Sequence, residues 1–274
     1  MNFVAAEEAP NHNNGLIKIH TAEEFDGMRV VGKKAANVLD LLCEFVVAGT
    51  STDALDKKAM EITFDLGAAP APLNYRGFRK SICTSINHVV CHGIPGDRVL
   101  REGDIMNVDV TLFYDGWHGD TSRMFAIGDT SVKARRLMDV TYESLMRGIE
   151  AVRPGARLGD IGAAIQEYAE SERMGVVRDF CGHGLGRVFH DMPNVLHYGR
   201  SGEGPELREG MFFTIEPMLN LGKPAVKLLN DGWTAVTRDR TLSAQYEHSI
   251  GITADGAEIF TKSLNGSDAP HKGL

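Results

Sequence analysis

Two aspartates on either side of a short turn are the first residues whose types and spacing could do chemistry. Asp109 interrupts an apolar segment, and Asp120 follows Asp115-Gly116, a dipeptide typical of two-residue hairpin turns. A turn there pairs Thr111 with Asp120 and makes the two aspartates diagonal neighbours on one face of the hairpin. Aspartate is depleted in strands, and buried like charges are costly unless cations separate them. The pair indicates a metal site, although a turn position alone would explain Asp120.

Three further side chains of metal-binding type lie farther along the chain. His183 stands in a glycine-rich segment, Glu216 ends an apolar run, and Glu247 interrupts a strand-like pattern. Alone, each has a structural explanation at least as good, such as a hydrogen-bonded loop histidine. Together with the two aspartates they form an oxygen-rich set, which suits Mn, Fe or Co better than a thiolate-selecting zinc site. Two carboxylates of such a set could bridge ions about 3.5–4 Å apart.

Three other histidines are of two kinds. His92, in Val-Cys-His-Gly-Ile-Pro, and His190, in Val-Phe-His-Asp-Met-Pro, are both bracketed by turn residues. That setting favours side chains presented into a cleft. His248 adjoins Glu247 and, on a strand, would point to the opposite face, so we interpret it as structural.

The elements that must position these side chains follow from capping signals and hydrophobic periodicity. A capping box at residues 21–24 begins a first helix, and a second is expected to start near residue 53 and to stop by Gly67. The sequence then predicts strands and loops over 68–98, a hairpin over 105–126, helices at roughly 131–152 and 158–174, and strands and loops after 176.

The order of these elements occurs twice, and residues repeat with it. Leu100-Arg-Glu-Gly103 recurs letter for letter as Leu207-Arg-Glu-Gly210, at an offset of 107. Asp109 and Glu216 each stand six residues after the final glycine. Ordered matches at a near-constant offset indicate two similar α+β halves related by a pseudo-twofold, whose strands join in one central antiparallel sheet with helices outside. Asp109 and Glu216 would then face each other across the axis.

Length and composition set the outer limits of function. The chain of 274 residues is 43% hydrophobic and carries a net charge of −8, which argues against a surface that neutralises nucleic-acid phosphates. No apolar run approaches the roughly 18 residues of a membrane span, and residues 1–14 lack the pattern of a signal peptide. Four widely spaced cysteines favour reduced thiols, so we expect a cytoplasmic protein. The expected organisation is a tail (1–20), one catalytic domain (21–263) with halves of about 21–128 and 129–263, and a second tail (264–274).

From about residue 21 to 263 the sequence resembles the type I methionine aminopeptidases. Those enzymes have a duplicated α+β fold, often called pita-bread, which agrees with the repeat. The resemblance rests on long, ordered motifs: NYRGFRKSICTSINHVVCHGIP (74–95), NVDVTLFYDGWHGDTSRMF (107–125), CGHGLGRVFHDMPNVLHY (181–198), FTIEPML (213–219) and QYEHSIGIT (245–253).

The resemblance implies a role for each chemical residue. It makes His92 and His190 contacts of the substrate near the scissile bond, and Glu216 the acid/base that moves a proton to the leaving amine. Phe78 stands where some members have tyrosine, which leaves a less polar wall. The implied metal ligands, for two divalent ions (Co, Mn, Fe or Zn), are Asp109, Asp120, His183, Glu216 and Glu247. The implied pocket for the methionine side chain is Tyr75, Phe78, Cys83, Phe189 and Trp233.

The implied reaction removes the N-terminal methionine from nascent proteins and peptides, with a small second residue and near the ribosome. We expect no sequence-specific binding to nucleic acid and no binding to a membrane. A proline-specific aminopeptidase of the same fold is the alternative enzyme, but such proteins usually carry a large N-terminal domain, and some 20 residues precede the first expected helix here. A third hypothesis is a homologue that binds a ligand without catalysis, and the five intact metal ligands argue against it.

Overall fold

A long β-hairpin forms the middle of the molecule in the computed structural model, which describes residues 2–8 and 15–270. Strands β6 (Ile105–Tyr114) and β7 (Trp117–Ala126) are joined through Asp115 and Gly116, whose φ angles of 49° and 81° are those of a mirror-image turn. Thr111 lies opposite Asp120, and Asp109 lies opposite Ser122. The register predicted from the turn dipeptide is therefore confirmed.

The hairpin belongs to an eleven-stranded sheet within the described residues. Its pairings are antiparallel except at one edge, where β1–β2 and β2–β10 are parallel. The path runs β1 (Phe3–Ala5), β2 (Ile17–Ile19), β10 (Asp191–Val195), β9 (Gly182–Gly184), β11 (Phe212–Ile215), β16 (Glu247–Thr253), β7, β6 and β3 (Ala69–Pro70), with β17 (Gly256–Ile259) on β16 and β4 (Cys83–Ile86) on β6.

Two three-stranded sheets flank the large one. They are β15 (Ser243–Gln245), β12 (Met218–Asn220) and β8 (Gly175–Val176), and β13 (Val226–Leu228), β14 (Ala235–Thr237) and β5 (Val89–Cys91). The second sheet pairs β14 with β5 and so joins segments about 140 residues apart in the chain.

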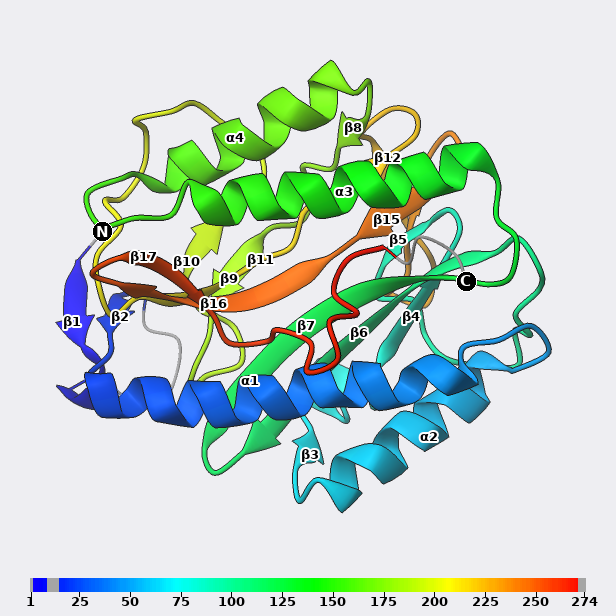
Figure 1. Ribbon diagram of the computed structural model, residues 1–274, viewed down its shortest axis with the longest axis horizontal. Coiled ribbons are helices and arrows are strands. Elements are labelled where there is room, and N and C mark those ends of the chain that lie inside the picture. Colours follow the sequence, from blue (N-terminus) through cyan, green and yellow to red (C-terminus); the bar gives the residue numbers. More distant parts are fainter. Residues whose placement is uncertain (1, 9–14, 271–274) are drawn as a thin grey trace.

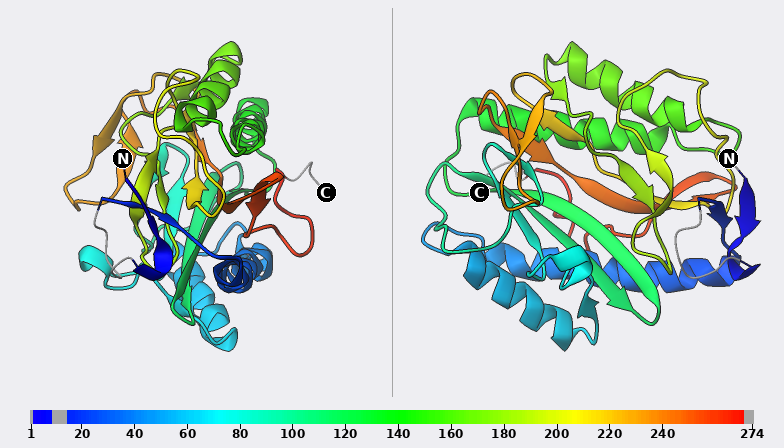
Figure 2. Two further views of the ribbon diagram at one scale, coloured as in Figure 1. Left: turned by 90° about the vertical axis from the view of Figure 1, so that its left-hand side faces the viewer. Right: turned by 180° about the vertical axis from the view of Figure 1, so that it is seen from behind.

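The long helices all lie on one side of the strands. In Figure 1 they lie in front of the central sheet, and in the view from behind the sheet lies in front of them (Figure 2). They are α1 (Ala22–Leu42), α2 (Thr52–Asp65), α3 (Val132–Glu150) and α4 (Leu158–Ser171), with short 3-10 turns η1 (Ala6–Glu8), η2 (Cys43–Phe45) and η3 (Tyr75–Gly77). Within the described ranges, no helix is long and apolar enough to cross a membrane. The opposite face of the sheet is thereby left for a site.

Capping fixes where the helices begin. The Thr21 backbone N–H donates to the Glu24 carboxylate at 3.0 Å, as the capping box predicts. The Ser51 hydroxyl accepts from the Ala54 N–H at 3.2 Å at the start of α2. The four helices predicted from sequence are thus present, with ends within a few residues of the expected ones.

The internal repeat is visible in backbone hydrogen bonds. Gly49 N–H donates to the Leu100 carbonyl at 2.9 Å, and Gly155 N–H donates to the Leu207 carbonyl at 2.9 Å. Strand β6 begins at Ile105 and β11 at Phe212, which keeps the offset of the sequence repeat. The duplicated α+β organisation predicted from the repeat is confirmed, while the limits proposed for the two halves stay a prediction.

Each helix pair covers its own apolar core. Side chains from α1, α2 and β6 form one buried cluster, and side chains from α3, α4 and β11 form another. The two clusters meet where β7 pairs with β16, with Ser122 opposite Glu247 and Thr121 opposite His248. This seam joins the hairpin to the strand that carries the last candidate ligand.

The two ends of the chain are more ordered than the tails expected from sequence. Residues 3–5 and 17–19 form β1 and β2 at the edge of the large sheet, and Lys18 Nζ lies 2.8 Å from Asp191 Oδ2 in a buried ion pair. Near the other end, Leu264 N–H donates to the Asp40 carboxylate at 2.9 Å. Three-residue strands give no periodicity in sequence, because their pairing with distant residues creates them. Residues 1, 9–14 and 271–274 of the expected tails lie outside the described ones.

Close packing of α1 against the sheet gives a stability prediction at Gly32. A Cβ at this position would lie 2.6 Å from the Phe260 carbonyl oxygen. Glycine to alanine inside an exposed helix normally stabilises by roughly 1 kcal/mol, but here the backbone clash should reverse the sign. We expect Gly32→Ala to lower the free energy of unfolding by about 1–3 kcal/mol in urea titrations. Lys33→Ala, at the exposed neighbouring position, is the control; a Gly32→Ala protein as stable as that control would contradict the packing argument.

Candidate metal centre and substrate pocket

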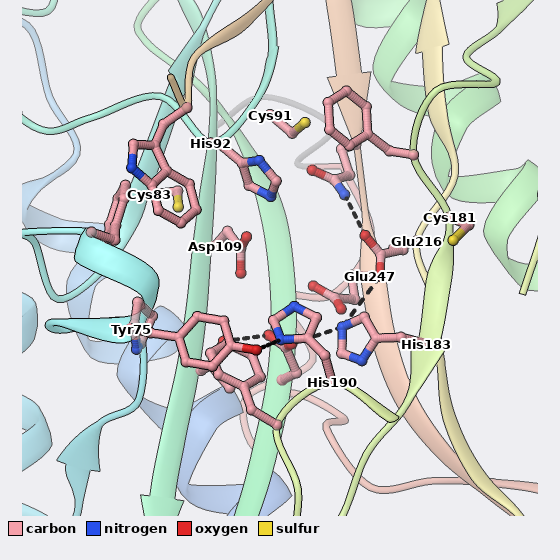
Figure 3. Close-up of a pocket in the computed structure, with 18 of the residues that line it drawn as sticks. Tyr75, Cys83, Cys91, His92, Asp109, Cys181, His183, His190, Glu216 and Glu247 are labelled. Carbon is pink, nitrogen blue, oxygen red and sulfur yellow. Dashed lines mark hydrogen bonds and ion pairs between the residues drawn. The ribbon is translucent and has the colours of Figure 1, made fainter. Parts of the chain in front are cut away.

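The five predicted ligands come together at one cavity of about 330 Å³. Asp109 belongs to β6 and Asp120 to β7, and both line the cavity. Figure 3 shows His183, Glu216 and Glu247 facing Asp109 from the other half. His183 lies on β9, Glu216 directly follows β11, and Glu247 begins β16. The pocket therefore lies across the seam between the halves.

Distances within the set are those of a potential chelating group. One ligand atom each from Asp120, His183 and Glu247 lies within 4.8 Å of the others. His183 Nε2 lies 3.5 Å from Asp120 Oδ2 and 3.7 Å from Glu216 Oε1. Asp109 lines the same cavity but is not part of that three-residue cluster.

Crowding of negative charge perturbs the carboxyl groups. Burial first, and then repulsion from neighbouring carboxylates, raises the pKa of Asp109 and of Glu247 well above their usual values. Burial raises the pKa of Glu216 to about 7, although His183 acts against this shift. Burial would lower the pKa of His183, but the hydrogen bond to Asp120 and the charge of Glu216 outweigh it and raise that pKa. Without bound cations, these acids can share the pocket only by holding protons.

The donor set fits divalent cations. Among the described residues, none donates a hydrogen bond to the side-chain carboxylate of Asp109 or of Glu247, although both line the cavity. One imidazole and four carboxylates are hard ligands that suit Mn, Fe or Co. Cations among them would offset the mutual repulsion and satisfy the free lone pairs.

Polar residues next to the candidate ligands were missed by the sequence reasoning as site residues. The Thr111 hydroxyl donates to Asp120 Oδ1 at 2.7 Å, and the Thr214 hydroxyl donates to Glu216 Oε1 at 2.7 Å. Gln245 Nε2 donates to Glu216 Oε2 at 3.2 Å. His197, fully buried, accepts from the Glu216 backbone N–H at 3.1 Å through Nε2. Only Thr111 had a signal in the sequence, namely its expected position opposite Asp120.

Both histidines expected in the cleft line the pocket. His190 Nδ1 lies 3.0 Å from the Tyr75 hydroxyl, and its ring lies 4.3 Å from that of His183. Burial, helped by the nearby His183, lowers the pKa of His190 to about 2, so its ring is neutral. The His92 ring packs edge-on against Phe180 at 5.4 Å and Trp233 at 6.1 Å. His248 instead bonds to the Thr261 hydroxyl, away from the site, as expected.

An aromatic slot adjoins the acidic cluster. Tyr75 and Phe189 lie 4.8 Å apart, and Phe78 meets Trp233 edge-on at 5.1 Å. The buried Cys83 thiol, whose pKa burial raises far above its usual value, completes the expected set. The structure thus brings all five predicted pocket residues to one cavity, and Cys91, Phe180 and Met218 are among the further residues that line it.

Comparison with known proteins identifies the class of this fold and site. The model of metallopeptidase family M24 matches residues 26–254, and the chain belongs to that family. A curated methionine aminopeptidase from Rickettsia prowazekii (strain Madrid E) is 57% identical over 255 residues, covering 93% of this chain and 98% of the relative. Within family M24, the chain is a member of the methionine aminopeptidases.

Solved structures agree with this placement. The crystal structure of methionine aminopeptidase from Rickettsia prowazekii superposes with a TM-score of 0.89 at 58% identity, covering 90% of this chain and all of that one. Prolidase from Pyrococcus furiosus superposes with a TM-score of 0.72 at 22% identity, covering 89% of this chain and 65% of that one. The second likeness shows the shared pita-bread fold alone.

Removing one acid should stabilise the metal-free protein. Asp109→Asn keeps the side-chain shape but removes one of the mutually repelling carboxylates. After treatment with a chelator, we expect this variant to be more stable than the wild type by on the order of 1 kcal/mol. Added Mn²⁺ should then raise the melting temperature of the wild type more than that of the variant, because ligand binding stabilises the folded state. Asp97→Asn, an exposed change, serves as control in thermal denaturation; a destabilised metal-free Asp109→Asn, or an undiminished Mn²⁺ response, would count against the site.

Proposed function

We propose that this chain removes the N-terminal methionine from nascent proteins and peptides, using two divalent metal ions bound by Asp109, Asp120, His183, Glu216 and Glu247. The observation that carries the proposal is the crowded acidic cluster, with its raised pKa values, at the side of an aromatic slot with a thiol in its wall. The membership among methionine aminopeptidases supports the same activity. We further propose that the enzyme acts in the cytoplasm, on chains that emerge from the ribosome.

Substrate recognition follows from the shape and chemistry of the slot. Tyr75, Phe78, Cys83, Phe189 and Trp233 offer an apolar surface that suits an unbranched thioether. A charged side chain would lose its hydration against these five apolar residues. The free α-amino group would lie toward the acidic cluster, which restricts cleavage to a chain terminus. A small second residue completes the expected preference.

Three side chains would handle the reacting atoms. When bound, divalent ions lower the pKa of a water molecule and polarise the scissile carbonyl. The Glu216 carboxylate, held by Thr214 and Gln245, would accept the proton of the attacking water and pass it to the leaving amine. In the tautomer whose Nδ1 accepts from the Tyr75 hydroxyl, His190 carries its ring proton on Nε2, from which it would donate to the carbonyl oxygen. His92 would bond to the leaving side of the same peptide bond.

A peptide assay tests the activity. We expect release of methionine from Met-Ala-Ser in the presence of Mn²⁺ or Co²⁺, measured by chromatography, and no release of the first residue from Lys-Ala-Ser or Glu-Ala-Ser. Excess chelator should abolish the activity, and added Mn²⁺ should restore it. An Xaa-Pro peptide is the comparison for the proline-specific alternative. Full activity after prolonged dialysis against chelator would refute the metal-dependent reaction, and efficient release of lysine would refute the pocket.

Two alanine variants separate the metal-binding role from the oxyanion role. His183→Ala should lose both activity and bound metal, since its ring lies within the ligand cluster. His190→Ala should keep its metal and fold but lose on the order of 10²–10³ in kcat, because a donor to a developing oxyanion acts in the transition state. KM should change little. Steady-state kinetics and metal analysis of both proteins decide the question: loss of metal in His190→Ala, or a near-normal kcat, would exclude the assignment.

A further inference from the structure

The loop between β9 and β10 carries side chains on which the proposed function depends. Gly184 pairs with Asp191, so residues 185–190 form a closed loop between two paired positions. His183 lies just before this loop, and Phe189 and His190 form its returning arm, with rings 4.1 Å apart. Whatever fixes the loop therefore fixes a pocket wall and the proposed carbonyl donor together.

His118, in the first half of the chain, contacts this loop at two separate points. Its backbone N–H donates to the Gly186 carbonyl at 2.8 Å, and its ring Nδ1 lies 2.9 Å from the same oxygen. Because a carbonyl oxygen only accepts hydrogen bonds, Nδ1 carries the ring proton. The His118 ring also stacks on Phe189, with centroids 5.6 Å apart and planes 12° apart. One side chain thus bridges the start of the loop and its returning arm.

Other contacts also hold the loop. On its returning arm, the Tyr75 ring lies 4.8 Å from that of Phe189, and the Tyr75 hydroxyl lies 3.0 Å from His190 Nδ1. Leu185 is buried in the core of the first half, and the Arg187 guanidinium lies 4.2 Å from the centre of the Trp117 ring. Both contacts fix residues 185–187, and neither reaches Phe189. The β6–β7 hairpin, in turn, is held by its own complete register and turn. Within the hairpin the His118 ring contacts Phe113 on the opposite strand, with centroids 5.0 Å apart, and its contacts with Gly186 and Phe189 reach out of the hairpin to the loop.

We propose that His118 is a positioning residue, which sets the β9–β10 loop through the Gly186 carbonyl and the Phe189 ring and so places His190 and one wall of the methionine slot. The inference rests on the proposed function. It assigns separate consequences to the two contacts of one ring. The hydrogen bond to Gly186 sets the position of His190, so its loss should lower kcat. The stacking on Phe189 sets the wall of the slot, so its loss should raise KM.

Two substitutions separate these contacts. His118→Phe keeps a ring against Phe189 but loses the donor, so we expect kcat to fall about 10- to 100-fold with a KM near that of the wild type, as for a displacement of reacting groups by about 1 Å. His118→Asn keeps a donor toward Gly186 but loses the ring, so KM for Met-Ala-Ser should rise several-fold with a smaller change in kcat. Metal content should equal that of the wild type in both. Equal losses in the two variants, or a kcat of His118→Phe within twofold of the wild type, would overturn the assignment.

A double-mutant cycle shows whether His118 acts through His190. In a His190→Ala background, His118→Phe should cause no further loss of kcat, because the group that it positions is gone. Full additivity of the two losses would mean that His118 acts elsewhere, and would refute the inference. Val38→Ala, a buried change on α1, controls for stability loss alone: it should lower the melting temperature and leave kcat unchanged. An inactive wild type would instead refute the proposed function, so the two failures are distinct.

Discussion

The carboxylates of the candidate metal centre repel one another inside a pocket that gives them few hydrogen-bond donors, and the fold must hold them there. Burial and the neighbouring carboxylates raise the pKa values of Asp109 and Glu247, which shows that the ionised form of both groups is destabilised at this site. Such a cluster forms only when the rest of the structure is stable enough to offset the repulsion. The two apolar cores, one under each helix pair, provide that stability at a distance from the site.

Rigid strands explain how the cluster keeps its geometry despite this repulsion. Every candidate ligand lies on a strand or directly after one, and the strands are neighbours in one sheet. Hydrogen bonds between the halves, such as Asn107 Nδ2 to the Gln245 carbonyl at 2.8 Å, fix the seam beside the site. Asp120 N–H likewise donates to the Ser249 hydroxyl across the β7–β16 pair at 3.1 Å. A site built this way is preorganised, so that binding of ions need not reshape the backbone.

The internal repeat gave both halves a similar frame but different site chemistry. Asp109 and Glu216 occupy equivalent places after the repeated Leu-Arg-Glu-Gly segments. The second half alone supplies His183 and the loop with Phe189 and His190, while the first half supplies Tyr75 and Phe78. Duplication thus explains the architecture, whereas the catalytic asymmetry arises from the connections between the repeated elements. This division is typical of folds whose loops carry function.

Local patterns in the sequence determined much of this protein. The Asp115-Gly116 turn set the hairpin register, capping residues set where the helices begin, and the repeat offset indicated the duplicated fold. The motifs that resemble methionine aminopeptidases named the ligands and pocket residues that the structure brings to one cavity. Only the tertiary structure decided that Thr214 and Gln245 bond to Glu216, that His118 contacts the β9–β10 loop, and that the first residues add strands to the sheet. Those contacts join segments far apart in the chain, and no local period or turn encodes which distant backbone a residue will meet.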